Sequence, residues 1–372
     1  MTGSGRYDAA IAGGGLLGCL TALKLAEGGM RVVVIERGGL CRGASGVNAG
    51  TISLQFVEPE AVPYVRKGRE LWQAAGDWLD RDLEFVSKGV LTLAFTEAEA
   101  ELLAAKSVEK NAAGAPNEIV TLENARRMEP SLSEHPVLVS YCALDGWIPA
   151  NLAGRAVGRA LRLAGIEVRE GVPVEGIEPS GIGYVLDAGG EAVAARRVVL
   201  AGGAWLIPMV RWLGFDLPLG CAVNQIIVTE RMAHFLGSTI GVARRGLTLK
   251  QAPNGTVLIG GGWQGEGDPE RGTVALIARN MRGNIKLARH CVPALDGVRA
   301  VRIWLGLQDK SPDDLPVFGP LPGRDDAFII ACAHSGFTMG PYVAGLLADV
   351  ILGREPEMPL FDPARLLAVG DK

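Results

Sequence analysis

The fold of this chain is decided near its beginning by the stretch Asp8-Ala-Ala-Ile-Ala-Gly13-Gly-Gly15-Leu-Leu-Gly18. The small and apolar residues before Gly13 predict a buried strand, and three glycines follow at G-x-G-x-x-G spacing. Gly13 permits a tight turn, Gly15 lets the backbone approach a pyrophosphate, and Gly18 lets a helix pack closely on the strand. Three leucines then lie on one face of the predicted helix: Leu16, Leu20 and Leu23.

A second strand and an acidic residue complete this motif. Gly28-Gly29 ends the helix, Arg31 to Ile35 predict a second parallel strand, and Glu36 lies at its end. The carboxylate falls about 20 residues after Gly15, where it is expected to accept hydrogen bonds from a ribose diol. The first helical turn offers free amides and a positive dipole end to the phosphates. The sequence therefore predicts a dinucleotide site.

Composition limits the class of protein. A length of 372 residues suggests two domains, and 48% apolar with 21% charged residues is typical of a globular enzyme. The formal net charge of -4 argues against nucleic acid as a partner, because a phosphate backbone needs a basic face. Apolar runs are too short for an integral membrane segment.

The start of the chain and the cysteines suggest a compartment. The first predicted strand begins by Asp8, which leaves no room for a secretory signal, so we expect a cytoplasmic location. The six cysteines include no C-x-x-C pair and are expected to be free structural thiols.

The rest of the chain predicts a discontinuous first domain and an inserted second one. Helices are expected over 64–82, 97–113 and 121–128, with a strand over 90–95 between them. Strand and helix alternate again over 151–169 and 197–205. Further strands are expected over 223–229, 247–251, 256–260 and 298–305, with a helix from about Val274 to His290. The final helix covers 335–351, with Pro341 in its first turn.

Two glycine-rich runs need separate interpretation. Arg37 to Gly50 is too rich in Gly, Ser and Asn for a helix or a central strand, so a loop is expected that lets the backbone approach a cofactor. Gly260 to Gly265 repeats the G-x-G-x-x-G spacing, but no apolar helix follows it. We therefore expect one dinucleotide site, which argues against an NAD(P)H-driven monooxygenase.

Several separated motifs together resemble the D-amino-acid oxidase (DAO) family of flavoproteins, and most closely its glycine oxidase, sarcosine oxidase and bacterial proline or hydroxyproline dehydrogenase members. Besides the opening fingerprint, the motifs are Ala44-Ser-Gly-Val-Asn-Ala-Gly50, Asp145-Gly-Trp-Ile-Pro149, Val198-Val-Leu-Ala-Gly-Gly-Ala-Trp205 and Gly336-Phe-Thr-Met-Gly-Pro341. The resemblance covers nearly the whole chain. It implies an α/β fold with a Rossmann-like FAD-binding domain (1–60, 150–220 and 315–372) and a mixed-sheet or antiparallel substrate domain (61–149 and 221–314).

The resemblance also implies an FAD site. The pyrophosphate would lie by the first glycines, the adenosine end by Glu36 and Arg37, and the flavin pyrimidine edge by the last helix, whose N-terminus favours negative charge. The implied residues are Gly13, Gly15, Leu16, Leu17, Gly18, Glu36, Arg37, Ala44, Ser45, Asn48, Ala49, Gly50, Val172, Ala201, Gly202, Gly203, Gly336, Phe337, Thr338 and Met339. The cysteine that binds flavin covalently in sarcosine oxidase falls near Gly306 here, so we expect non-covalent FAD.

The implied chemistry is hydride transfer from a carbon next to a substrate amine to flavin N5, after which the imine is hydrolysed by water. No side-chain base and no metal site is expected. Glycine oxidase has arginines where this chain has Gln308 and His334, so the usual fork for a substrate carboxylate is missing. Arg302, Arg245 or Lys250 could replace it, or the carboxylate lies elsewhere or is absent.

Substrate contacts are therefore predicted at Asn48, Trp263, Arg302, Gln308 and His334. An aromatic wall is a weaker alternative to plain core packing for four rings: Trp147, Tyr141, Trp263 and Trp304.

Three functions stay open at this point. The first is an oxidase that passes electrons to oxygen and acts on a bulkier or N-substituted amino acid. The second is a dehydrogenase subunit that passes electrons to a partner, in an oligomer or heteromeric complex. The third is a flavin-binding scaffold without catalysis.

Overall fold

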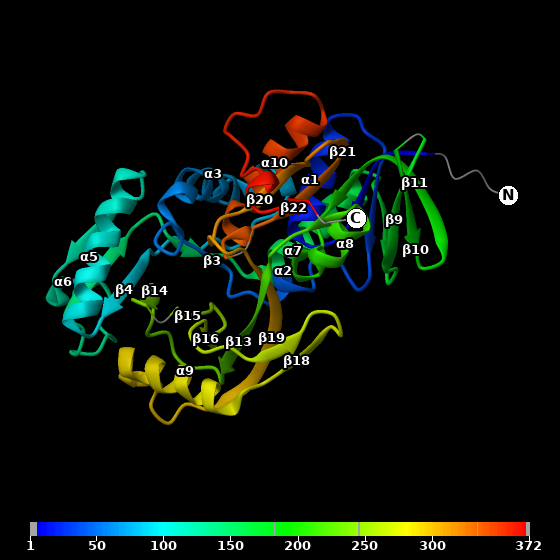
Figure 1. Cartoon of the computed structure of the whole chain (residues 1–372). Helices are drawn as coiled ribbons and strands as arrows, with labels where there is room; N and C mark the ends of the chain where they lie inside the picture. The colour runs from blue at the N-terminus through cyan, green and yellow to red at the C-terminus, as the bar shows by residue number, and fades with distance from the viewer. Residues whose placement is uncertain (1–5, 182, 245, 333, 370–372) are drawn as a thin grey trace.

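The computed structural model describes residues 6–181, 183–244, 246–332 and 334–369. Two large sheets organise these residues, one in the upper right and one in the lower left of Figure 1. None of the described helices is long and apolar enough to cross a membrane.

The first sheet has the order β20-β21-β11-β1-β2-β8, and β10 and β9 extend it from β11. β1 pairs in parallel with both β11 and β2, as the opening motif predicts. The strands are β1 (Tyr7–Ala12), β2 (Val32–Glu36), β8 (Glu167–Glu170), β9 (Val174–Ser180), β10 (Gly183–Ala188), β11 (Glu191–Leu200), β20 (Val317–Leu321) and β21 (Arg324–Ala331).

Both faces of this sheet are covered, which explains why β1 is apolar at consecutive positions. Ala9 and Ile11 face a core built with α1 (Leu16–Glu27), α3 (Val62–Gln73), α7 (Ala150–Leu163) and α10 (Gly336–Ile351). Ala10 and Ala12 face a second core with β10 and α8 (Leu206–Trp212).

The second sheet has the order β19-β13-β16-β15-β14-β4-β6-β5. β14 and β4 pair in parallel and the other pairs are antiparallel. The strands are β4 (Val90–Ala94), β5 (Asn117–Val120), β6 (Leu138–Cys142), β13 (Gly220–Thr229), β14 (Thr239–Val242), β15 (Thr248–Gln251), β16 (Val257–Gly260) and β19 (Ala300–Lys310). The helices α5 (Glu97–Ala112), α6 (Leu122–Met128) and α9 (Ala278–Cys291) accompany it (Figure 1).

Shorter pairs join other segments of the chain. β3 (Thr51–Ile52) pairs with β7 (Gly146–Trp147), and β12 (Phe215–Asp216) pairs with β22 (Ala368–Val369). β17 (Glu266–Asp268) and β18 (Thr273–Ala275) form a hairpin.

The predicted mixed α/β fold is confirmed. The strands of the first sheet all fall within the segments predicted to bind FAD, and those of the second sheet fall within the other segments, except that β13 begins at Gly220. The two-domain division itself stays a prediction. The Gly260–Gly265 run leads into β17 and not into a helix, in agreement with its interpretation as a false dinucleotide motif.

Three predictions of where a helix or loop begins or ends were wrong. One helix was expected over 64–82, but α3 ends at Gln73 and a separate α4 (Ala75–Leu79) follows. The helix expected from Val274 begins only at Ala278, because the preceding residues pair with β17. The loop expected over 37–50 contains a helical turn, α2 (Ala44–Val47).

Tertiary contacts explain why α2 forms in spite of its composition. The Ser45 hydroxyl accepts a hydrogen bond from Leu16 N at 2.9 Å, and the Asn48 side chain donates to the Ala44 and Ser45 carbonyls at 3.2 and 2.7 Å. These bonds tie the turn to α1 and close its C-terminal end. The bond between Ser45 and Leu16 joins residues distant in sequence, so local propensity does not predict it.

Pro341 lies in the second turn of α10, and not in the first as predicted. Proline has no N–H, so the Phe337 carbonyl loses its usual helical donor. The indole Nε1 of Trp72 in α3 donates to this carbonyl at 2.7 Å, and its ring stacks on Phe337 with centroids 5.3 Å apart. The interior proline is thereby accommodated, and α3 supports the beginning of α10.

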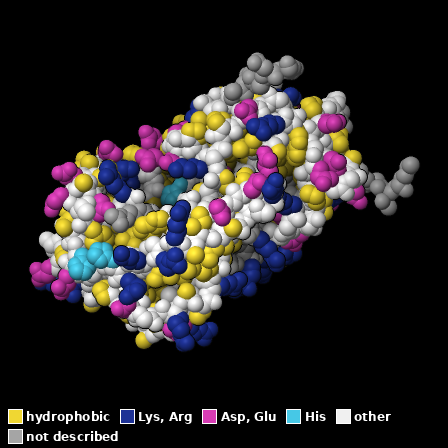
Figure 2. All heavy atoms as spheres, turned by 60° about the horizontal axis from the view of Figure 1, so that its bottom comes forward, with side chains coloured by type: hydrophobic (Ala, Val, Ile, Leu, Met, Phe, Trp, Pro, Cys, Tyr) yellow, Lys and Arg dark blue, Asp and Glu magenta, His cyan; other side chains and the backbone are white. Residues whose placement is uncertain are grey.

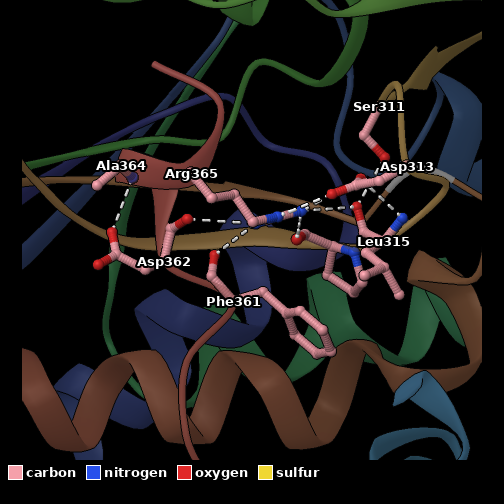
Figure 3. Close-up of polar contacts among 8 residues, drawn as sticks. Ser311, Asp313, Leu315, Phe361, Asp362, Ala364 and Arg365 are labelled. Atoms are coloured by element: carbon pink, nitrogen blue, oxygen red, sulfur yellow. Dashed lines mark hydrogen bonds and ion pairs between the residues drawn. The ribbon is translucent and has the colours of Figure 1, made fainter. Parts of the chain in front are cut away.

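Arg365 ties the C-terminal segment to the loop between β19 and β20 (Figure 3). Its Nε donates to Asp313 Oδ2 at 2.9 Å, and Nη2 donates to the Pro316 carbonyl at 2.5 Å. Nη1 donates to the Phe361 carbonyl at 3.0 Å. Partial burial raises the pKa of Asp313, but the hydrogen bonds from Arg365 and from Leu315 N outweigh it, and the net pKa lies below its usual value.

Arg365→Ala is expected to lower the free energy of unfolding by about 1–3 kcal/mol, because several carbonyls and one carboxylate lose a half-buried donor. Urea unfolding of the FAD-saturated protein measures this. The control is Arg354→Ala, which removes a surface ion pair at 3.6 Å and should cost less than about 0.5 kcal/mol. Equal losses in the two variants would contradict a special role of Arg365.

Candidate cofactor and substrate site

A cavity of about 640 Å³ extends from the opening glycines to the second sheet. One end is lined by the glycine turn, by Glu36 and by Trp205, and the other by residues of β13, β15 and β19. The beginning of α10 and the segment from Ala44 to Ser53 line it in between. The carboxyl ends of β1 and β2 thus open into the cavity, as expected for a nucleotide site in a parallel sheet.

The three glycines of the opening motif differ in what requires them. Gly13 has φ +117°, and a Cβ there would lie 2.4 Å from the Ala201 carbonyl oxygen. A Cβ on Gly18 would lie 2.1 Å from the Gly13 oxygen, so this glycine permits the close approach of helix and strand. A Cβ on Gly15 would meet only Ser45 Oγ, at 3.4 Å. Because Gly15 lines the cavity, the space that its side chain would fill is open to a ligand.

Glu36 is oriented by backbone amides at the end of β2. Its two carboxylate oxygens accept hydrogen bonds from Gly14 N and Gly38 N, both at 2.7 Å. Each oxygen has a further lone pair, so the carboxylate can also accept from a ribose hydroxyl.

The beginning of α10 forms the middle of the cavity wall. Gly336, Phe337 and Thr338 line the cavity, and the first amides of a helix have no partner within it. The Thr338 hydroxyl donates to the Thr51 carbonyl at 3.2 Å, which joins α10 to β3. This helix end can therefore stabilise negative charge on a bound group.

Lys250 supports the same wall from behind. It is 1% exposed and does not line the cavity. Its Nζ donates to the Ala49 carbonyl at 2.9 Å and to Thr51 Oγ1 at 2.5 Å. Burial lowers the pKa of Lys250 to about 7. The lysine holds two cavity-lining residues in place and is not positioned to bind a substrate carboxylate.

The lowered pKa of Lys250 predicts a pH effect on stability. Between pH 7 and about 10.5 the unfolded chain holds a proton that the folded protein has lost, so folding becomes more favourable as pH rises. Relative to Lys250→Met, the FAD-saturated wild-type protein should gain about 1–3 kcal/mol of unfolding free energy from pH 7 to pH 9. Urea unfolding of both proteins at the two pH values measures the gain. If the free energy of unfolding changes equally with pH in the wild-type and Lys250→Met proteins, the lowered pKa of Lys250 is contradicted.

The end of the cavity next to the second sheet is polar but has no described cation. Asn224 of β13 and Gln308 of β19 line it, and the Asn224 amide donates to Gln308 Oε1. Arg37 and Arg42 are the arginines among the described lining residues, which include no lysine, and both lie at the Glu36 end.

His334 and Cys332 also line the cavity. The His334 imidazole is open to the cavity but enclosed by protein on its other sides, and this burial lowers its pKa below the usual value. The imidazole is therefore neutral at pH 7 and adds no positive charge. Burial raises the pKa of the Cys332 thiol well above its usual value, which makes the thiol a poor nucleophile.

Most of the predicted site residues line one cavity. Those brought together are Gly13, Gly15, Leu16, Leu17, Glu36, Arg37, Ala44, Ser45, Asn48, Ala49, Gly50, Ala201, Gly202, Gly203, Gln308, His334, Gly336, Phe337 and Thr338. Gly18 and Met339 lie behind the wall as packing residues, and Val172 donates its N–H to the Glu36 carbonyl at 3.0 Å. The specific role of each residue stays a prediction.

Two predicted substrate residues lie away from the cavity. Trp263 packs on Gly283 of α9, and Arg302 is exposed on β19, where its guanidinium faces the Trp304 ring at 5.7 Å. Arg245 lies outside the described residues. Trp147 is buried behind the wall, beside Lys250.

Sequence reasoning missed several lining residues: Phe56, Trp205, Met209, Trp212, Asn224, Ile226, Thr248 and Asp309. One signal was present for Asn224, which together with Gln225 interrupts the apolar residues of its strand. The others line the cavity because of long-range strand register and the docking of α8, neither of which has a local pattern.

The residues present fit a dinucleotide cofactor. Gly15 leaves open space where no neighbouring protein atom requires a glycine, Glu36 is held in the cavity wall, and two helix N-termini line the same cavity. The cavity continues beyond this dinucleotide end, so a substrate can approach the second sheet.

Comparisons with known proteins agree with this arrangement. A family model described as FAD dependent oxidoreductase (DAO) matches residues 8–350. Glycine oxidase of Geobacillus kaustophilus (strain HTA426) is 28% identical over 364 residues, covering 95% of each chain. The crystal structure of glycine oxidase from Geobacillus kaustophilus has a TM-score of 0.88 at 29% identity, covering 96% of this chain and 97% of that one.

Two further relatives carry other names. A subunit of the opine oxidase of Rhizobium meliloti is 27% identical, covering 96% of this chain and 97% of that protein. The crystal structure of L-proline dehydrogenase from P. horikoshii has a TM-score of 0.89 at 23% identity, covering 97% of both chains, and supports the fold alone.

Proposed function

Because the chain belongs to the DAO family of FAD-dependent oxidoreductases, we propose that it oxidises an amine or amino acid at the carbon next to nitrogen. One observation carries the proposal: a single cavity joins the dinucleotide turn, the start of α10 and the polar ends of β13 and β19. Bound FAD would supply the two-electron acceptor for the substrate hydride. The imine that forms is released to water and hydrolysed.

The chain itself contributes binding and electrostatics. The glycine turn and Glu36 would hold the dinucleotide end, and the α10 N-terminus would stabilise negative charge at the other end. Asn224 and Gln308 would orient the polar group of the substrate. The buried, protonated Cys332 thiol supports non-covalent attachment of the cofactor.

The proposed substrate class follows from the lack of a described cation at the second-sheet end of the cavity. With neutral Asn224 and Gln308 at the second-sheet end and a neutral His334 before α10, a bulkier or N-substituted amino acid suits the site better than glycine. The names of the relatives, which include glycine and opine enzymes, support this range. The six free cysteines suit a reducing compartment, which supports a cytoplasmic location as part of the proposal.

Oxygen is the proposed acceptor, and a partner protein is the second candidate. One observation favours the second: four large apolar side chains are exposed in the segment from β16 to β19, namely Trp263 (36%), Val274 (39%), Leu276 (39%) and Val301 (61%). Figure 2 shows the lower face of the molecule, where hydrophobic side chains lie among many Lys and Arg side chains. Exposed apolar side chains of this kind favour a surface that binds another protein.

Steady-state assays test the proposal. The FAD-loaded protein is mixed in air with glycine, N-alkyl glycines, proline and larger amino acids of both configurations. Peroxide formation that is fastest with an N-substituted or bulky substrate is the expected result. If turnover requires an added electron-accepting dye, the natural electron acceptor is a partner protein and not oxygen. If none of these compounds reduces the flavin, the chain is a flavin-binding subunit without catalysis.

A further inference from the structure

The β17–β18 hairpin, which packs beside the second sheet, contacts the dinucleotide end of the cavity through Trp205. The indole Nε1 of Trp205 donates to the Pro269 carbonyl at the hairpin tip, at 2.5 Å. The Arg37 guanidinium carbon lies 3.7 Å from the centre of the Trp205 ring. A Cβ built on Gly272 would lie 3.4 Å from Arg37 Nη2. One tip therefore contacts both members of an arginine–tryptophan stack.

This stack forms part of the cavity wall, whereas the hairpin lies outside it. Arg37 and Trp205 line the cavity beside Glu36, and no residue from Glu266 to Ala275 does. The base of the hairpin is anchored on the second sheet, because Gly265 N donates to the Val223 carbonyl at 2.8 Å and Gly267 packs on the Val223 side chain. In Figure 1 the hairpin extends from the lower lobe toward the side that carries α8.

The position of Arg37 depends on Trp205. Among the described residues Arg37 forms no ion pair, so the ring face is its main fixed contact, and a cation on such a face gains about 0.5–2 kcal/mol. The Trp205 ring packs against a cluster that includes Val223 and Leu307, and its single indole hydrogen bond to the hairpin fixes its orientation there. The hairpin thus restrains the Trp205 ring, and the ring restrains Arg37, and both side chains line the cavity.

We propose that the β17–β18 hairpin is a clasp that retains FAD by holding Trp205 and Arg37 against its adenosine end. The clasp acts on cofactor release and not on substrate oxidation, so it depends on FAD binding alone and not on which amine is oxidised. Trp205 is then a positioning residue that couples the second sheet to cofactor affinity.

Two changes remove the clasp in different ways. Trp205→Phe keeps a ring under Arg37 but deletes the donor to Pro269. Replacing Pro269–Gly272 by Asn-Gly removes the acceptor and closes the paired residues Asp268 and Thr273 with a two-residue turn. Trp78→Phe is the matched control, because it deletes an indole bond to the Leu71 carbonyl, at 2.8 Å, from a ring that does not line the cavity.

The measurement is the rate at which FAD leaves the holoenzyme, followed by the rise of flavin fluorescence on dilution. Trp205→Phe and the shortened hairpin should each release FAD about three- to tenfold faster, the range expected from one lost hydrogen bond. The double variant should match the single variants, because both changes break one contact. Trp78→Phe should release FAD at the wild-type rate, and the visible spectrum of bound flavin should be unchanged in all four proteins.

Other results would overturn the proposal. Wild-type release rates in the shortened hairpin, or rate increases that multiply in the double variant, would show that Trp205 does not act through the hairpin. If Trp205→Phe fails to fold, the FAD release rate of the shortened-hairpin variant alone tests the proposal. Since the release rate needs no substrate, failure here is distinguishable from failure of the proposed amine oxidation.

Discussion

Gly15→Val is expected to weaken FAD binding by about 100-fold or more while the protein stays folded. A Cβ at residue 15 meets only Ser45 Oγ, at 3.4 Å, and the backbone there (φ -68°, ψ 175°) is extended, so valine fits the fold. Its methyl groups would occupy the space in the cavity where the pyrophosphate is expected. Titration of the apoprotein with FAD measures the affinity, and circular dichroism reports the fold.

The control for this prediction is Gly13→Ala. Here the added Cβ would lie 2.4 Å from the Ala201 oxygen at a φ of +117°, so alanine should destabilise the turn itself. We expect a lower free energy of unfolding in Gly13→Ala and an unchanged one in apo Gly15→Val. Tight FAD binding by Gly15→Val would contradict the position assigned to the pyrophosphate.

Asp145→Ala is expected to lower the free energy of unfolding by about 2–4 kcal/mol. The carboxylate is fully buried and accepts hydrogen bonds from Ser53 Oγ at 2.5 Å and from Leu54 N at 2.7 Å. Alanine would leave both donors buried without an acceptor. Ser53 lines the cavity, so FAD affinity should fall as well.

The comparison for Asp145→Ala is Asp145→Asn. Burial raises the pKa of Asp145 to about 6, which shows that the charged form is costly in this site. Asparagine keeps an acceptor oxygen without the charge and should lose less than half as much stability at pH 7. Urea unfolding of the FAD-saturated proteins measures both. Equal losses would mean that the hydrogen bonds to Ser53 and Leu54 contribute little.

Much of the first sheet could be predicted because its signals are local. Ala9 to Ala12 are buried on alternate faces, Gly18 is required by its close contact with Gly13 in the same strand–turn–helix unit, and Glu36 ends the next strand. These features repeat a short motif whose geometry is fixed by a few residues. The last helix was equally visible from its apolar residues.

The errors arise where distant residues decide the local structure. α2 forms because Ser45 binds Leu16 N, and α10 accepts Pro341 because Trp72 satisfies the Phe337 carbonyl. Neither partner is near in sequence. Local patterns describe the propensity of a segment, and tertiary hydrogen bonds overrode that propensity at both places.

The substrate end of the site was predicted less well for a similar reason. Asn224, opposite Gly306, and Gln308, opposite Ala222, are diagonal neighbours only because β13 and β19 pair in one particular register, and a shift by one residue would place them on opposite faces of the sheet. Arg302 and Trp263 were placed near the substrate from residue type, but Arg302 is exposed and Trp263 packs on α9. Residue chemistry without register cannot separate these cases.

Anaerobic mixing of the FAD-loaded protein with amino acids and N-alkyl glycines tests the central claim most directly. If the cavity brings a substrate amine to bound FAD, at least one of these compounds should reduce the flavin, with loss of its yellow absorbance and release of a keto acid or aldehyde after hydrolysis. A flavin that stays oxidised with every amine tried, although dithionite reduces it, would contradict the account.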